Sequence, residues 1–144
     1  MVHIEDLGSH FDAPIETVWK FILSPEEHGR SHGNRRNVRG EPDGENRMRV
    51  SWEQHVNGQW VKVANQVTMF APVAQLVHST EGPLAGSRFL MYYAPKGGRT
   101  AVNVIGDFQS PVIPPAQLEA MVLASLSEAF DDDSAAIRAM AGKK

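Results

Sequence analysis

The sequence predicts an α+β protein in which a curved antiparallel sheet of about six to seven strands wraps around one long C-terminal helix. Residues 47–56 and 60–69 alternate apolar and polar side chains with a period of two, which is typical of strands. Residues 15–23 and 115–141 instead repeat their apolar side chains every three or four positions, which is typical of helices. The links between the expected strands have hairpin length, and this favours an antiparallel meander.

The N-terminal part predicts one strand followed by two short helices. Residues 2–11 are expected to form the strand, and Asp12-Ala13-Pro14 marks the change of period. One apolar stripe then predicts the first helix: Ile15, Val18, Trp19, Ile22 and Leu23. Ser24-Pro25 is a second helix-start signal, and residues 30–44 are polar enough to predict a loop with room for one edge strand.

The middle of the chain predicts a run of hairpins. Asn57-Gly58 stands between two alternating segments, residues 47–56 and 60–69, and is the strongest short hairpin signal in the chain. Shorter strands are expected at about 74–80, 88–94 and 100–108.

The C-terminal part predicts a helix over about 115–141, roughly 40 Å long at 1.5 Å per residue. It is the one long helix available to cover the apolar face of the sheet. Because a curved sheet seldom closes completely on a helix, we expect a hollow between them that can hold a ligand.

Composition excludes several classes of function. The 144 residues include no cysteine, so a disulfide scaffold, a thiol nucleophile and any cysteine metal site are excluded. The net charge of −3 argues against a nucleic-acid binder. No apolar run reaches the length of about 18 residues that a membrane span needs. The start of the sequence has no basic leader or apolar signal region, so we expect a cytoplasmic protein. We also expect a monomer or homodimer that uses no cofactor.

The segment from Phe11 to Trp19, read with the order of the predicted elements, resembles the START/polyketide-cyclase/birch-allergen superfamily. Members of this superfamily open with a strand that leads into Ala-Pro-x-x-x-Val-Trp, as residues 13–19 do here. They close with a long helix in which an apolar residue precedes acidic residues, as in residues 130–133. The resemblance implies one helix-grip domain over residues 1–144 with an apolar cavity beneath the long helix. It also implies a lipid, a polyketide or another hydrophobic small molecule as ligand.

The phase of each strand predicts which side chains line this cavity. Asn65 stands between two valines on an otherwise apolar face, so it must either bind a ligand or pin a neighbouring strand. The expected lining residues are Trp52, Asn65, Met69, His78, Met91, Tyr93, Val104, Phe108, Val122 and Ser125.

Three of these residues could carry chemistry. His78 alternates in phase with Leu76 and would act as a general base, and either Tyr93 or Asn65 would stabilise the enolate oxygen by donating a hydrogen bond. For each, the alternative is an ordinary strand residue. A slip of one residue in the register would exchange the inner and outer faces.

His28 and His32 have the i, i+4 spacing of two metal ligands on one helix face. Gly29 argues against a regular helix between them, and no carboxylate shares the spacing, so we expect no metal. Asp131, Asp132 and Asp133 are expected to form a solvated helix face, with Asp133 able to tie the helix to a loop.

Three functions follow from these observations. The first is binding of a hydrophobic small molecule, driven by about 25 cal/mol per Å² of buried apolar surface. The second is a cofactor-independent enzyme of the polyketide cyclase/dehydratase type that uses the same cavity. The third is an interaction module that stimulates the ATPase of a chaperone through its surface, as one branch of the resembling superfamily does.

Overall fold

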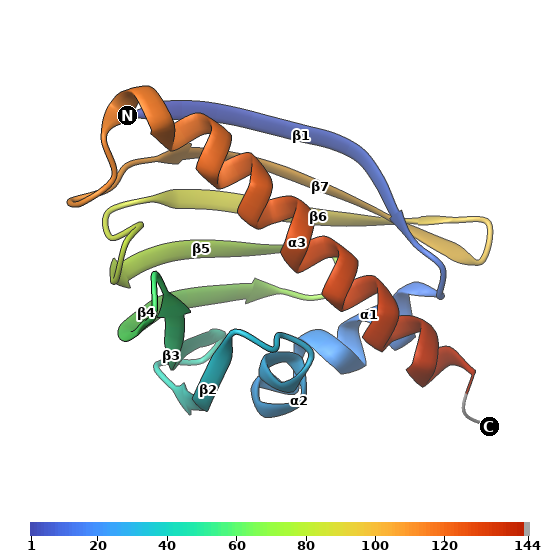
Figure 1. The fold of residues 1–144 in the computed structure, drawn as a ribbon. Helices are drawn as coiled ribbons and strands as arrows, with labels where there is room; N and C mark the ends of the chain where they lie inside the picture. Colours follow the sequence, from blue (N-terminus) through green and yellow to red (C-terminus); the bar gives the residue numbers. More distant parts are fainter. Residues whose placement is uncertain (143–144) are drawn as a thin grey trace.

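A seven-stranded antiparallel sheet curves around one long helix (Figure 1). The computed structural model describes residues 1–142, apart from the side chains of Glu26 and Glu27. The strands are β1 (Val2–Phe11), β2 (Arg35–Pro42), β3 (Arg47–Val56), β4 (Gln59–Phe70), β5 (Ala74–Glu81), β6 (Arg88–Lys96) and β7 (Arg99–Phe108). The helices are α1 (Ile15–Ile22), α2 (Pro25–Arg30) and α3 (Pro115–Ala141). The α+β class, the meander and the long C-terminal helix are therefore confirmed.

The strand order is β1-β7-β6-β5-β4-β3-β2, and β1 pairs with β7 at the end of the meander. Every pair of neighbouring strands is antiparallel. Two hairpin turns, the predicted one at Asn57-Gly58 and another at Gly97-Gly98, use left-handed backbone. Asn57 and Gly58 have φ values of 51° and 80° between β3 and β4, and Gly97 and Gly98 have 56° and 79° between β6 and β7. Positive φ at both central residues is the requirement of the tight turn that suits twisted strands.

The predicted loop over residues 30–44 contains the edge strand β2, which pairs with β3. Helix α2 lies on β2 because two glycines allow the close approach. A Cβ atom at Gly29 would collide with Val38, and one at Gly40 would lie 2.6 Å from Pro25.

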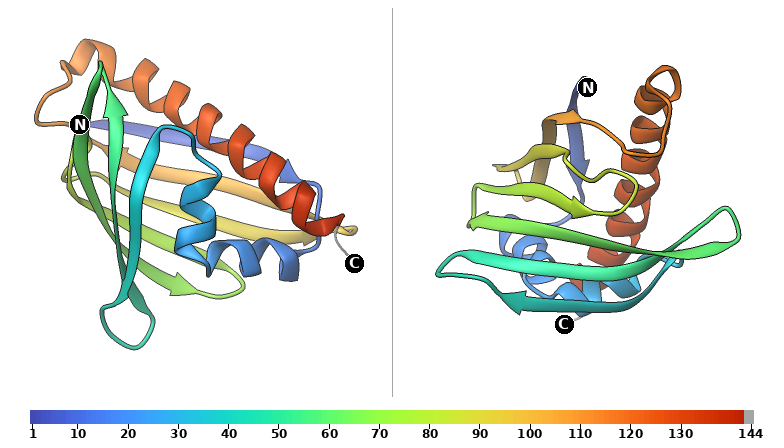
Figure 2. Two further views of the ribbon diagram at one scale, coloured as in Figure 1. Left: turned by 60° about the horizontal axis from the view of Figure 1, so that its bottom comes forward. Right: turned by 90° about the vertical axis from the view of Figure 1, so that its left-hand side faces the viewer.

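Helix α3 crosses the concave face of the sheet diagonally (Figures 1 and 2). It is anchored near both ends by apolar side chains. Leu118 and Val122 pack into a core cluster with Ile4 and Phe108, and Ile137 belongs to a second cluster around α1. Within residues 1–142, no helix is apolar enough over sufficient length to cross a membrane.

The second cluster joins α1 to the sheet. Phe11 stacks on Phe130 of α3 with ring centroids 5.0 Å apart, and Trp19 meets the ring of Tyr93 edge-on at 5.5 Å. The Nε1–H of Trp19 also donates to the carbonyl oxygen of Pro72 at 2.8 Å. The short helix is thus fixed against both α3 and the turn between β4 and β5.

Candidate functional site

The strand register defines which side chains face α3. Residues directly opposite each other in a sheet share a face. Met69 of β4 packs against the inner core cluster, so it marks the concave face. The residues in register with it on the next three strands are Gln75, Met91 and Val104, and they share that face. The same register places Trp52, Asn65, Tyr93 and Phe108 on this concave face, together with Val50, Val67, Val77 and Phe89.

The concave face is only partly covered. Met48, Val50, Asn65, Phe89 and Met91 all point inward and remain partly accessible to solvent. Side chains of a close-packed core are sealed from water. The apolar inner surface of β3, β4 and β6 is therefore not completely covered by α3.

Asn65 contributes a polar group to this surface. It is half-buried between Val63 and Val67 and lies opposite Val50 on β3 and Ser79 on β5. Within residues 1–142, its amide makes no hydrogen bond, so it does not pin a neighbouring strand. Because the side chain is partly accessible, its amide is open to water.

Tyr93 is buried, and its hydroxyl donates a hydrogen bond of 2.9 Å to Oε1 of Gln75. The Nε2 group of Gln75 lies 3.6 Å from the sulfur of Met69. Burial raises the pKa of Tyr93 far above its ordinary value of 10.0, and the negative charge of Asp133 raises it further. The phenol therefore stays protonated and can act as a hydrogen-bond donor.

Trp52 forms the wall near the outer end of β3. Its Nε1–H donates to Oε1 of Gln54 at 3.2 Å. The guanidinium of Arg35, from β2, lies 4.5 Å from the centre of the indole ring, within the range of a cation–π contact.

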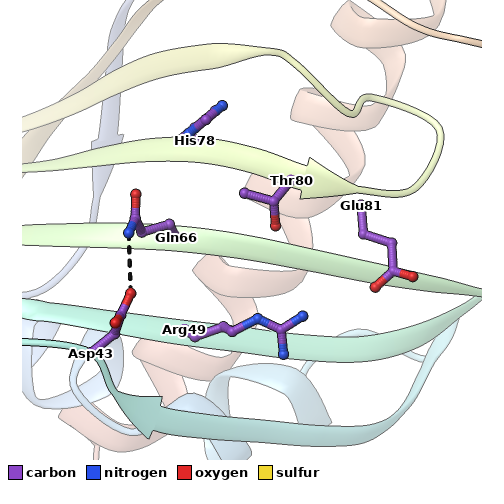
Figure 3. A pocket seen from close by; sticks show the side chains of 6 residues that line it. All are labelled: Asp43, Arg49, Gln66, His78, Thr80 and Glu81. Carbon is purple, nitrogen blue, oxygen red and sulfur yellow. Dashed lines mark hydrogen bonds between the residues drawn. The ribbon is translucent and has the colours of Figure 1, made fainter.

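His78 lies on the opposite face of the sheet. It is paired with Gln66 and Arg88, and Figure 3 shows it beside Gln66 on the convex side. These side chains belong to an open polar groove of 590 Å³ lined by Asp43, Arg49, Gln66, His78, Thr80 and Glu81. The expectation that His78 faces the cavity is wrong. Leu76, which set the predicted phase, is itself 42% exposed on the convex face.

Comparison with known sequences found no match. No family model fits this chain, and no curated protein is significantly similar to it in sequence.

Solved structures match over nearly the whole chain. Ara h 8.0201 superimposes with a TM-score of 0.77 at 12% identity, covering 96% of this chain and 98% of that one. The Zhui aromatase/cyclase from Streptomyces sp. R1128 gives 0.71 at 15% identity, covering 97% and 93%. An AHSA1-like protein from Aeromonas hydrophila gives 0.69 at 16% identity, covering 99% and 96%.

The chain has the helix-grip fold. This confirms, at the level of the fold, the resemblance seen in Phe11–Trp19 and in the order of the elements. Helix-grip proteins with different functions share this architecture, so the functional argument must come from the side chains of this chain.

Helix α3 contributes fewer of the predicted lining residues to the concave face than expected. Val122 is buried in the core cluster beneath α3 and faces the sheet. Ser125 is exposed, beside the stripe formed by Leu118, Val122, Leu126 and Ile137. Its predicted place on the packing stripe is therefore wrong, because Leu126 takes that position.

A second group of polar side chains lies where α2 meets α3, and we call it the His–Asp cluster: His28, His32, Asp132 and Asp133. His32 is 3% exposed and contacts both aspartates, while His28 contacts Asp133. Burial raises the pKa of Asp133, but the two imidazoles outweigh burial and hold it at about 2, compared with the ordinary 3.8.

Sequence reasoning missed two features of these sites. Gln75 is buried on the concave face, but its position became visible only from the register of β5 with β4 and β6. The carboxylates of the His–Asp cluster come from α3, about one hundred residues after the histidines, so local spacing could not reveal them.

Proposed function

We propose that the chain, acting as one domain over residues 1–144, binds a hydrophobic small molecule between the concave face of the sheet and α3. The observation that carries this proposal is the partly accessible apolar inner surface with the unpaired amide of Asn65 in its middle. Apolar burial would supply most of the affinity, at about 25 cal/mol per Å², and Asn65 would orient the polar end of the ligand. The ligand would be a lipid, a polyketide or a similar aromatic or isoprenoid molecule.

The helix-grip neighbours support the fold on which this proposal depends, and one of them is an aromatase/cyclase. Cyclase chemistry is therefore the second candidate. Tyr93 could donate to an enolate oxygen, after release from Gln75. His78 is not proposed as the base, because it lies on the far side of the sheet from Tyr93.

The first test uses a fluorescent apolar probe, 1-anilinonaphthalene-8-sulfonate, and one variant that fills the concave face. Asn65→Trp places an indole among Val50, Val63 and Val67 and is expected to abolish saturable enhancement of probe fluorescence. Gln66→Trp adds the same side chain at the next position, on the convex face, and is expected to bind the probe as the wild type does. Equal loss in both variants, or in neither, would contradict the proposal.

The second test identifies the ligand. Native mass spectrometry of protein purified from its own source, followed by organic extraction, is expected to reveal a bound apolar molecule. Once that molecule is known, its conversion in the presence of the wild type and of Tyr93→Phe distinguishes an enzyme from a carrier. If the protein binds none of a panel of lipids and aromatic polyketides but captures one stoichiometric protein partner, that result would favour the interaction module instead.

A further inference from the structure

The His–Asp cluster brings three metal-ligating side chains to one point. Nε2 of His28 lies 3.1 Å from Oδ1 of Asp133, and Nε2 of His32 lies 3.0 Å from the same oxygen. One ligand atom from each of the three side chains can be chosen so that all lie within 4.8 Å of one another. Figure 2 (left) shows why: α2 lies beside the C-terminal half of α3.

His32 supplies the decisive detail. Its Nδ1 atom lies 3.1 Å from Oδ2 of Asp132. A carboxylate can only accept, so the Nδ1 atom of His32 carries the proton and donates it. In the neutral ring, Nε2 is then left with a lone pair that faces the cluster.

This Nε2 atom is buried and has no hydrogen-bond partner within the described residues 1–142. Oδ1 of Asp133 is close, at 3.0 Å, but it does not lie in the direction that a hydrogen bond from the ring requires. A proton on Nε2 would therefore be a buried donor without an acceptor. Without that proton, a buried lone pair lies 3.0 Å from a carboxylate oxygen, and neither atom can donate to the other. A positive ion bonded to both atoms resolves the conflict.

We propose that His28, His32 and Asp133 bind a divalent transition-metal ion of the Zn²⁺ type. Two imidazoles and one carboxylate are a ligand set that Zn²⁺ uses when it keeps a further position open for water or another ligand. Tetrahedral bonds of about 2.0–2.1 Å to the metal place neighbouring ligand atoms roughly 3.3–3.4 Å apart. The two nitrogen–oxygen distances around Asp133, 3.1 Å and 3.0 Å, are a few tenths of an ångström shorter, so metal binding requires only a small outward shift of these side chains.

Asp132 would serve as a positioning residue. Its hydrogen bond to Nδ1 fixes the ring of His32 with Nε2 turned toward the metal, an arrangement that metal-binding histidines commonly have. The hydroxyl of Ser31 donates to the carbonyl oxygen of His28 at 2.6 Å and also lies 3.2 Å from Oδ1 of Asp133. Imidazole ligands favour transition metals over Mg²⁺ and Ca²⁺, which prefer oxygen ligands.

The proposed metal site borders the concave face without depending on it. Arg35, which lies on the ring of Trp52, connects the two regions: burial lowers the pKa of its guanidinium, and the negative charges of Asp133 and Asp132 oppose that shift. The proposal holds whether or not a small molecule binds beneath α3, and its test uses the metal alone.

The test is a titration of chelator-treated, metal-free protein with Co²⁺, followed by its visible absorption, and then displacement of Co²⁺ by Zn²⁺. One Co²⁺ ion per chain is expected, with full displacement by Zn²⁺ and no competition from a large excess of Mg²⁺. Asp133→Asn and His28→Gln are expected to remove saturable binding. Asp132→Asn is expected to weaken binding by about 10-fold to 100-fold, the effect typical of removing a group that orients a ligand.

Two control variants separate the site from general effects. Asp131→Asn changes an exposed carboxyl on the same helix, and His78→Gln removes an imidazole on the convex face; both are expected to bind Co²⁺ as the wild type does. His28 is partly exposed, so His28→Gln keeps the proposal testable if the buried variants fold poorly. Absence of saturable binding to the wild type, or full binding to folded His28→Gln, would overturn the proposal.

Discussion

Tyr93 and Gln75 form a buried polar pair on a surface that is otherwise apolar. Each side chain is the hydrogen-bond partner of the other, so removal of one leaves the other buried without a partner. A buried group in that position costs more free energy than the hydrogen bond itself contributed. This pair therefore makes the free energy of unfolding depend on pH through a single side chain, Tyr93.

Tyr93→Phe is expected to lower the free energy of unfolding by about 1–3 kcal/mol at neutral pH, because Oε1 of Gln75 loses its donor. Urea unfolding followed by tryptophan fluorescence measures this change. Tyr92→Phe, at the neighbouring position on the other face, is the matched control and should change stability by less than about 0.5 kcal/mol. Equal losses in the two variants would contradict the role of the pair.

The pKa of Tyr93 also predicts a dependence on alkaline pH. Burial raises this pKa above 10.0 in the folded state, so the folded protein keeps a proton that the unfolded chain releases. The stability that Tyr93 contributes is complete below pH 10 and falls as the pH rises above it. Between pH 9 and pH 11, the wild type should therefore lose more stability than Tyr93→Phe. Parallel curves for the two proteins would show that the phenol ionises freely.

Residue-scale errors in the sequence analysis have one physical cause. Leu76 and Val77 are neighbours with similar hydrophobicity, so the sequence of β5 does not reveal which of them faces the core. The inner phase carries the polar Gln75 and Ser79, which made the outer phase appear more apolar. The predicted face was correct for Asn65, whose strand combines strong alternation with an apolar inner row. Tyr93 also faces inward, but β6 is apolar on both faces, so the register with β7 and not the sequence decides its side.

Helix α3 shows how well a single element can be predicted. Pro115 can begin a helix, and Gly142 follows its last residue, so the predicted range 115–141 agrees with the structure. Strand β2 was harder to predict because it is an edge strand with exposed residues on both faces and an irregularity between Arg36 and Arg39. Its sequence lacks the alternation by which strands are recognised.

Anchoring of α3 by its ends gives a prediction at the scale of the element. Ile137 is 1% exposed and lies in the core cluster around α1. Ile137→Ala should lower the free energy of unfolding by about 2–5 kcal/mol, as buried truncations usually do. Leu123→Ala changes a residue of the same helix that is 41% exposed, and it should have little effect. Chemical denaturation of both variants compares them directly.

At the scale of the whole molecule, stability should differ between the two edges of the sheet. β1 is covered by α3 and contributes Ile4 and Phe11 to both core clusters, whereas β2 is largely exposed. Backbone amides with few buried neighbours open most easily. Hydrogen exchange followed by mass spectrometry should therefore show fast exchange in β2 and slow exchange in β6 and β7. Equal protection of β2 and β6 would contradict this expectation.

The path of contacts from β1 to β2 has a mechanical consequence. α3 packs on β1, α2 packs on β2, and the His–Asp cluster joins α2 to α3. The two edge strands of the sheet, β1 and β2, are therefore connected through α3. The sheet, the helix and the His–Asp cluster together form a closed ring. On the β2 side, the polar contacts of the His–Asp cluster close this ring, and the apolar contacts of Ile137 hold the same part of α3 against α1.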